Sequence, residues 1–227
     1  MIYSQPRSSP ARFVVAIIAI FGSGARKNLV SRLGRNVRAV LAALALVVLP
    51  AVTGTVAAQT PSMLDEPVSQ TSAGLFHTCA LTTAGAVKCW RSNVNGQLGD
   101  NSTTQSLTPV NVVGLGSGVA VFSAGVHHTC ALTTAGAVKC WGANGNGQLG
   151  DNSTANRSTP VDVVGLGSGV AAISEGGVHT CALTTTGAVK CWGYNGNGQL
   201  GDNSTTDRLT PVDVVGLGSG VAAISAG

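Results

Sequence analysis

The sequence predicts an all-β fold made of blades of four-stranded antiparallel sheet. A unit of 51 residues occurs three times without a gap, at 72–122, 123–173 and 174–224, and residues 225–227 begin a fourth copy. The second and third units differ at 8 positions, and the first and second differ at 12. Short strand-like runs separated by glycine-rich turns fill each unit, and helical periodicity is absent from the repeats. A fixed period of this length is typical of propeller blades or of a solenoid.

Residues 1–58 are predicted to form a leader helix for export. Three arginines precede an apolar run over residues 39–52, and small residues at 56–58 offer a cleavage site. An uncleaved membrane anchor is the alternative, since the apolar stretch is about long enough to span a bilayer. A further apolar stretch lies upstream at 13–21, so a translation start near residue 30 would leave a leader of ordinary length, 30–58. Residues 59–71 are predicted to form a linker.

The charge is divided unevenly between the leader and the repeats. Residues 1–58 hold seven Lys or Arg and no Asp or Glu, whereas the chain from Gln59 onward holds six basic and nine acidic residues, a net charge of 6 − 9 = −3. The repeats therefore lack the basic stripe of a phosphate-binding surface, which argues against a nucleic-acid partner. We expect a secreted or cell-surface protein, periplasm included, with membrane contact only through an uncleaved leader.

One predicted hairpin in each unit carries two cysteines. In the first unit the strands are 77–81 and 87–90, and Gly85 supplies the positive φ of the turn. If the hairpin centres near Ala84, Cys79 and Cys89 face each other at a distance that a disulfide can bridge. Two buried free thiols are the alternative. The predicted pairs are Cys79 with Cys89, Cys130 with Cys140, and Cys181 with Cys191.

Two further strands complete the predicted blade. They cover 109–113 and 119–123 in the first unit and are joined by the glycine-rich turn 114–118. The proline that opens the first of them is tolerated on an edge strand, where no ladder donor is lost. A polar loop, 93–107, connects this strand to the hairpin.

The second unit resembles the regulator of chromosome condensation repeat. The resemblance rests on His-Thr-Cys-Ala-Leu at 128–132, Gly-Ala-Val-Lys-Cys-Trp-Gly at 136–142, Asn-Gly-Gln-Leu-Gly-Asp at 146–151 and Thr-Pro-Val at 159–161. It extends over residues 72–227 and implies a β-propeller, usually of seven blades. One eukaryotic member of the family is a nucleotide exchange factor for a small GTPase, and a secreted bacterial relative inhibits β-lactamases.

Three units imply an open, partial propeller. Seven units would need about 7 × 51 = 357 residues, so we expect the remaining blades to be missing from this chain, unless copies of the chain assemble. No unit carries an insertion resembling the wedge that the exchange factor uses against its GTPase.

Several residues recur once in every unit. The histidines are expected to be held by hydrogen bonds and the tryptophans to pack between blades, although a shared metal and a stacking surface are the functional alternatives. These residues are His77, His128 and His179, and Trp90, Trp141 and Trp192. The polar loops have a composition used for calcium, but one Asp per loop is few for that ion, and turn formation accounts for the composition.

No catalytic constellation is visible, because near-identical units supply the same groups three times. We therefore expect no enzymatic activity, no cofactor and no metal. The leading hypothesis is an exported, non-catalytic scaffold that binds an unidentified protein, or a surface polymer, through blade loops that differ between units. Arg91 and Tyr194 are the first expected contacts. The alternative is a guanine nucleotide exchange factor for a small GTPase.

Overall fold

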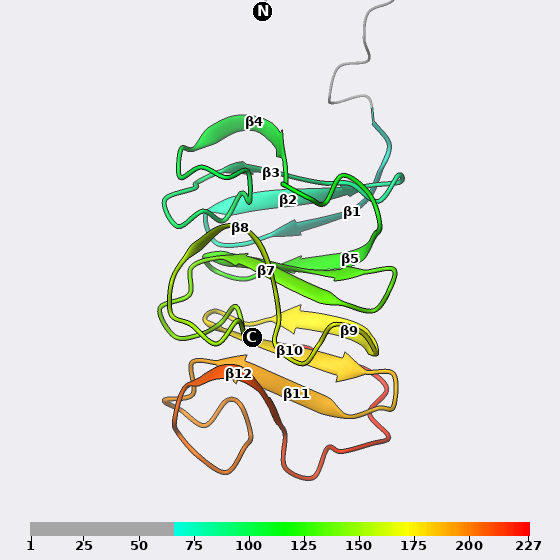
Figure 1. The fold of residues 1–227 in the computed structure, drawn as a ribbon, viewed down its shortest axis with the longest axis vertical. Helices are drawn as coiled ribbons and strands as arrows, with labels where there is room; N and C mark the ends of the chain where they lie inside the picture. The colour runs from blue at the N-terminus through cyan, green and yellow to red at the C-terminus, as the bar shows by residue number, and fades with distance from the viewer. Residues whose placement is uncertain (1–65) are drawn as a thin grey trace, which may run out of the picture. The chain divides into compact units, whose positions relative to one another are not determined.

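The computed structural model describes residues 66–227, which form three four-stranded antiparallel sheets (Figure 1). The predicted leader, 1–58, lies outside the described residues. The first sheet contains β1 (Val68–Ala73), β2 (His77–Thr82), β3 (Val87–Arg91) and β4 (Ser106–Asn111). The second contains β5 (Val119–Ala124), β6 (His128–Thr133), β7 (Val138–Gly142) and β8 (Arg157–Asp162). The third contains β9 (Val170–Glu175), β10 (His179–Thr184), β11 (Val189–Gly193) and β12 (Arg208–Asp213).

Each sheet is a meander in which consecutive strands are neighbours, and the sheets are stacked as blades (Figure 1). The predicted all-β blade architecture is confirmed. The outer strand β4 begins at Ser106, three residues before the predicted start, and therefore carries Pro109 in its interior. Its position at the edge of the sheet explains how it tolerates a proline. No helix among residues 66–227 is long and apolar enough to cross a membrane.

The structural blade and the 51-residue repeat are offset. Strand β5 lies at the end of the first repeat, but it pairs with β6 of the second repeat, with Ser123 opposite Cys130. The turn between them is only three residues long, so pairing across the repeat boundary needs little loop closure. The three blades consequently span 68–111, 119–162 and 170–213. Every repeat boundary falls inside an inner strand.

The cysteine pairs form three disulfides, as predicted. Cys79 stands directly opposite Cys89 in the β2–β3 register, and the equivalent pairs in the other blades do the same. The Cα atoms are 4.1 Å apart in each pair. The register follows from a tight turn in which Gly85 adopts a φ of 81° and its N–H donates to the carbonyl of Thr82. Each disulfide therefore fastens the central hairpin of one blade.

The apolar core lies between the blades. Phe122, Ala131 and Trp141 of the second blade pack against Leu98 and Val112 of the first. A second cluster joins the second and third blades in the same way, around Leu149 and Trp192. The third cluster is smaller, and residues of the chain segment 221–224 cover part of it. Blade stacking is thus the interaction that buries each blade's apolar face.

Candidate functional site

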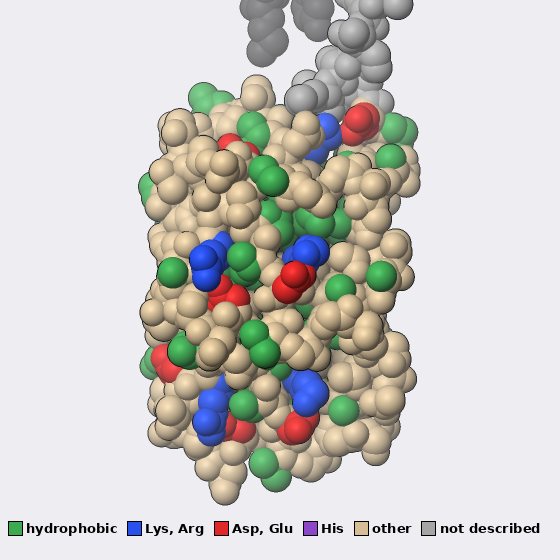
Figure 2. All heavy atoms as spheres, in the orientation of Figure 1, with side chains coloured by type: hydrophobic (Ala, Val, Ile, Leu, Met, Phe, Trp, Pro, Cys, Tyr) green, Lys and Arg blue, Asp and Glu red, His purple; other side chains and the backbone are tan. Residues whose placement is uncertain are grey.

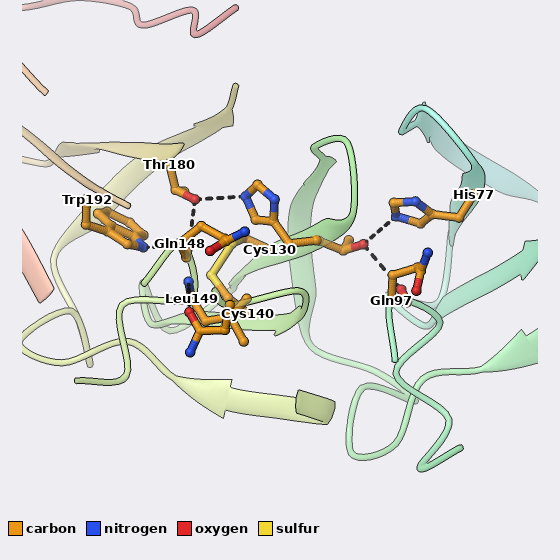
Figure 3. The surroundings of a disulfide bond; sticks show 11 residues. His77, Gln97, Cys130, Cys140, Gln148, Leu149, Thr180 and Trp192 are labelled. Carbon is orange, nitrogen blue, oxygen red and sulfur yellow. Dashed lines mark hydrogen bonds between the residues drawn. A yellow bond between two sulfur atoms is a disulfide. The ribbon is translucent and has the colours of Figure 1, made fainter. Parts of the chain in front are cut away.

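The recurring His and Trp residues form one repeated contact between neighbouring blades (Figure 3). His77 Nε2 lies 2.8 Å from Thr129 Oγ1 of the next blade. The threonine hydroxyl donates to the carbonyl of Gln97 at 3.4 Å, and Trp141 Nε1 donates to that same carbonyl at 2.9 Å. We call this arrangement the interblade clasp. The contact is structural: His77 Nε2, the threonine hydroxyl, the glutamine carbonyl and the indole N–H bond one another within the protein, while His77 Nδ1 is buried without a partner among the described residues.

The second clasp repeats these contacts one blade further on. His128 Nε2 lies 3.0 Å from Thr180 Oγ1, while Thr180 Oγ1 and Trp192 Nε1 both donate to the carbonyl of Gln148 at 2.9 Å. Since the threonine uses its single proton on that carbonyl, the histidine must donate through Nε2–H. The remaining ring nitrogen, Nδ1 of His128, is buried without a hydrogen-bond partner among the described residues.

These histidines are held neutral. Burial, and to a lesser extent the neighbouring histidines, lower the pKa of His77 to about 4 and that of His128 to about 3. Burial also lowers the pKa of His179. His77 and His128 bond different threonines and are spread along the stack. No group of three His, Cys, Asp or Glu residues within 66–227 could hold a metal.

The polar loops are tied internally. The side-chain amide of Asn144 donates to Asp151 Oδ1 at 2.9 Å and to the carbonyls of Ser153 and Ala155, while its oxygen accepts from Leu149 N. Arg157 Nε donates to the other oxygen of Asp151 at 2.8 Å. Burial raises the pKa of Asp151, but hydrogen bonds from Ser153, Arg157 and Asn144 outweigh it, and the net pKa is lowered. The aspartate is therefore committed to loop structure.

Residues that differ between the repeats gather along one end of the blades. In each blade the turn between the first two strands is hydrogen-bonded to the start of the polar loop: Ser92 N to Phe76 O at 3.1 Å, Ala143 N to His127 O at 2.9 Å, and Tyr194 N to Val178 O at 3.0 Å. We call these six residues, with Leu75, Val126 and Gly177, the variable rim. Neighbouring blades are joined there by Val126 N donating to Gly177 O at 3.4 Å.

The variable rim carries an exposed apolar and aromatic patch on the first two blades. The rings of Phe76 and His127 are stacked with centroids 5.3 Å apart. Leu75 is 64% exposed and Phe76 is 50% exposed. The sequence showed that these positions vary, but it did not show that they meet, because the contact joins residues one repeat apart across two blades. An aromatic patch of this kind is characteristic of a protein-binding surface.

The two predicted contact residues lie in different places. Tyr194 belongs to the variable rim of the third blade, where its ring lies over Gly196 of its own loop. Arg91 is at the end of β3 with a φ of 84°, where the other two blades have Gly142 and Gly193. Its side chain is exposed on the first blade. The structure does not bring Arg91 and Tyr194 together.

One acidic residue of the repeats is buried next to the rim. Glu175 replaces the alanine found at 73 and 124, it is 8% exposed, and neither carboxyl oxygen has a hydrogen-bond partner among the described residues. Burial raises its pKa to about 8. The carboxyl group is therefore protonated at neutral pH.

Charges on the visible face lie in opposite pairs (Figure 2). Lys139 pairs with Asp162 and Lys190 with Asp213, each at 2.6 Å, while the arginines of the polar loops pair with Asp151 and Asp202. Lysines and arginines that are neutralised in this way leave little free positive charge for phosphate.

The fold and the clasp define a class of protein. It is a stack of propeller blades, each fastened by a disulfide, in which the residues that differ between repeats lie on loops. Two family signatures, both described as the Regulator of chromosome condensation (RCC1) repeat, match the chain. One covers 68–97, 119–148 and 170–199, and the other covers 85–132, 135–183 and 186–227. The chain belongs to the RCC1 repeat family.

Relatives of known description share the repeats but are longer. The chain is 41% identical over 158 residues to the human protein described as probable E3 ubiquitin-protein ligase HERC4. The aligned region covers 68% of this chain and 15% of HERC4. It is 34% identical over 154 residues to the mitochondrial RCC1 domain-containing protein RUG3 of Arabidopsis thaliana, covering 66% of this chain and 35% of RUG3.

Among solved structures, yeast RCC1 (Prp20) bound to Kap60 aligns with a TM-score of 0.57 at 19% identity, covering 65% of this chain and 37% of that one. At this identity the likeness shows the fold alone.

Proposed function

We propose that this protein is an exported, non-catalytic propeller scaffold that binds another protein through the variable rim. The observation that carries the proposal is the stacked Phe76–His127 pair beside exposed Leu75, since it places apolar and aromatic surface where the repeats diverge. Loops on a rigid repeat scaffold are the usual carriers of recognition.

Three disulfides indicate an oxidising, non-cytosolic environment and support export. Fractionation of the producing cells, with thiol alkylation before lysis, tests this part. Export predicts unmodified cysteines and recovery outside the cytoplasm. Alkylated protein recovered only from the cytosol would contradict it.

Partner binding is tested by capture and cross-linking of extracellular proteins on the immobilised chain. A double variant, Leu75→Ser with Phe76→Ser, should lose the captured protein, because it removes the apolar patch without touching the core. Tyr194→Ala tests the rim of the third blade. The matched control is Val164→Ser, which changes an apolar residue of similar exposure, 48%, in the turn at the opposite end of the strands. Capture that survives every rim variant would refute the proposal.

Nucleotide exchange on a small GTPase is the second candidate. It is favoured by family membership and by the fold shared with yeast Prp20p, whose structure is described together with its binding to Gsp1p and histones. Release of labelled GDP from a GTPase in the presence of the chain measures this activity directly. We expect no acceleration.

A further inference from the structure

Each polar loop contains an Asn-Ser-Thr triplet at the same position. An asparagine followed two residues later by serine or threonine is the acceptor motif for N-linked glycosylation, which modifies surface loops of exported proteins. A motif this short also occurs by chance, so the folded position of each triplet matters. The triplets occupy 101–103, 152–154 and 203–205, and a fourth acceptor triplet, Asn-Arg-Ser, occupies 156–158.

The asparagines of the three Asn-Ser-Thr triplets are exposed. Asn101 and Asn152 are exposed even though another blade follows each of them, and Asn203 is exposed at the same position of the third blade. The backbone is fixed at these points, because Asn101 N donates to Ser158 O at 2.9 Å and Asn152 N donates to Leu209 O at 3.0 Å. The side-chain amide is therefore held at the surface by a backbone that is bonded to the next blade.

The backbone conformation of the loop accounts for an asparagine at this position. Asn101, Asn152 and Asn203 have φ values of 65°, 59° and 60°, in the left-handed region that asparagine tolerates better than most residues. The turn alone thus explains the first residue of the triplet without any sugar. The evidence for modification must come from the other two residues.

The serine of each triplet is committed to the loop, whereas the threonine is not. Ser153 donates to Asp151 Oδ1 through its backbone N at 3.1 Å and through its hydroxyl at 2.8 Å. Thr154 is exposed, as are Thr103 and Thr205, and these loop bonds do not use the threonine hydroxyl. A hydroxyl at this position is the group that the acceptor motif requires. The motif therefore accounts for a threonine that the loop network does not.

The fourth triplet has a different environment. Asn156 Oδ1 accepts from Asn144 N at 2.9 Å, and Asn156 Nδ2 donates to Asn95 Oδ1 of the preceding blade at 3.2 Å. Ser158, its third residue, packs against Gly96 of that blade. A sugar on Nδ2 would push Asn156 away from Asn95, so this triplet is unsuitable as an acceptor.

We propose that Asn101, Asn152 and Asn203 carry N-linked sugars and that Asn156 does not, an inference that rests on the export in the proposed function. In the transfer, Nδ2 of the asparagine loses a proton and bonds to the anomeric carbon of a lipid-linked oligosaccharide, and the lipid pyrophosphate leaves. The three disulfides support this assignment, because they indicate the oxidising, exported environment in which modified surface loops occur.

The first two sugars begin at the seams between blades. The backbone bonds from Asn101 to Ser158 and from Asn152 to Leu209 each join consecutive blades, and the modified side chains project from the same residues. Bulky, solvated groups at these points add polar surface along the stack. The sugars are thus compatible with blade packing, since no buried contact has to open to admit them.

Peptide mass spectrometry of the protein recovered outside the cytoplasm of its own producing cells tests the proposal, with fragmentation to locate each sugar. We expect sugar on Asn101, Asn152 and Asn203 and an unmodified Asn156. Exported protein with unmodified triplets overturns this proposal and leaves export standing. A chain retained in the cytosol without sugar overturns both, and cell fractionation distinguishes the two failures.

Two neighbouring threonines provide a matched pair of variants. Thr103 and Thr104 are both exposed, and the second repeat has Ala155 at the position of Thr104, so the fold accepts alanine there. Thr103→Ala should lose the sugar on Asn101 completely, whereas Thr104→Ala should keep it. Thr103→Ser retains the hydroxyl and should keep the sugar as well. Sugar that persists in Thr103→Ala, or that is lost equally in Thr104→Ala, refutes the assignment.

Discussion

The threonine hydroxyl of each clasp serves two partners at once. It accepts from the histidine of the preceding blade and donates to that blade's glutamine carbonyl, and Thr129 and Thr180 are both fully buried. Removing the hydroxyl leaves the histidine Nε2–H buried without its partner, which costs about 1–3 kcal/mol, whereas the glutamine carbonyl still accepts from the tryptophan Nε1.

Thr180→Val should accordingly lower the free energy of unfolding by about 1–3 kcal/mol. Thr78→Val is the matched control, because Thr78 has the same sequence context but contacts no preceding blade among the described residues. Urea denaturation measures both. Equal effects at the two positions would contradict the role given to the clasp.

Glu175 makes stability depend on pH between about 4.5 and 8. Its carboxyl group keeps its proton in the folded state until about pH 8, whereas in the unfolded chain it ionises near 4.5. Stability therefore falls as pH rises through this window. Glu175→Gln should match the wild type near pH 5 and exceed it by several kcal/mol near pH 9, as measured by urea denaturation. A constant difference across that range would show that ionisation is not the cause.

For individual residues, the sequence predicts whether a side chain packs or forms a hydrogen bond, but not which residue it contacts. A tryptophan at one place in each repeat indicates packing between blades, and a buried histidine next to a threonine indicates a hydrogen bond. The bond that forms, however, joins His77 to Thr129 rather than to the adjacent Thr78, because the relevant distance crosses from one blade to the next. One sequence does not reveal such stacking geometry.

Among the elements, the hairpins were the most predictable. Cysteines ten residues apart around a Gly-containing turn fix the register of β2 and β3, and the disulfide follows from that register. The start of β4 and the pairing of β5 were less predictable, since both depend on neighbouring strands. Strand β5 pairs with the hairpin that follows it because the turn between them has only three residues. This pairing produces the offset between blade and repeat.

Each disulfide should contribute about 2–3 kcal/mol, the chain-entropy estimate for a loop of this length. Replacing both Cys130 and Cys140 by Ser should lower the urea midpoint by a corresponding amount and leave the β-sheet circular dichroism spectrum unchanged. The wild type treated with a reductant provides a second measurement. A variant that unfolds completely would contradict this expectation. It would show that the hairpin needs its disulfide to fold, even though extensive packing joins the blades.

For the whole molecule, acid is expected to be destabilising. His77 and His128 have folded pKa values of about 4 and 3, below the 6.5 of the unfolded residue. The unfolded chain therefore binds more protons below pH 6.5, and stability declines as pH falls toward the folded values. Thermal melts of the Glu175→Gln variant, in which the opposite pH dependence of Glu175 is removed, should show a decreasing midpoint at pH 7.5, 5.5 and 4.0, and adding His128→Gln should flatten the decrease. A midpoint independent of pH would contradict neutral, buried rings.

The offset between repeat and blade bears on how such a protein can change its size. Because every blade takes its inner strand from one repeat and its hairpin from the next, a duplication of any 51 consecutive residues adds one whole blade and one whole interface, wherever the cut falls. Recombination between copies as similar as 123–173 and 174–224 therefore needs no particular breakpoint. The number of blades is a quantity that unequal exchange in the gene can raise or lower without breaking the fold.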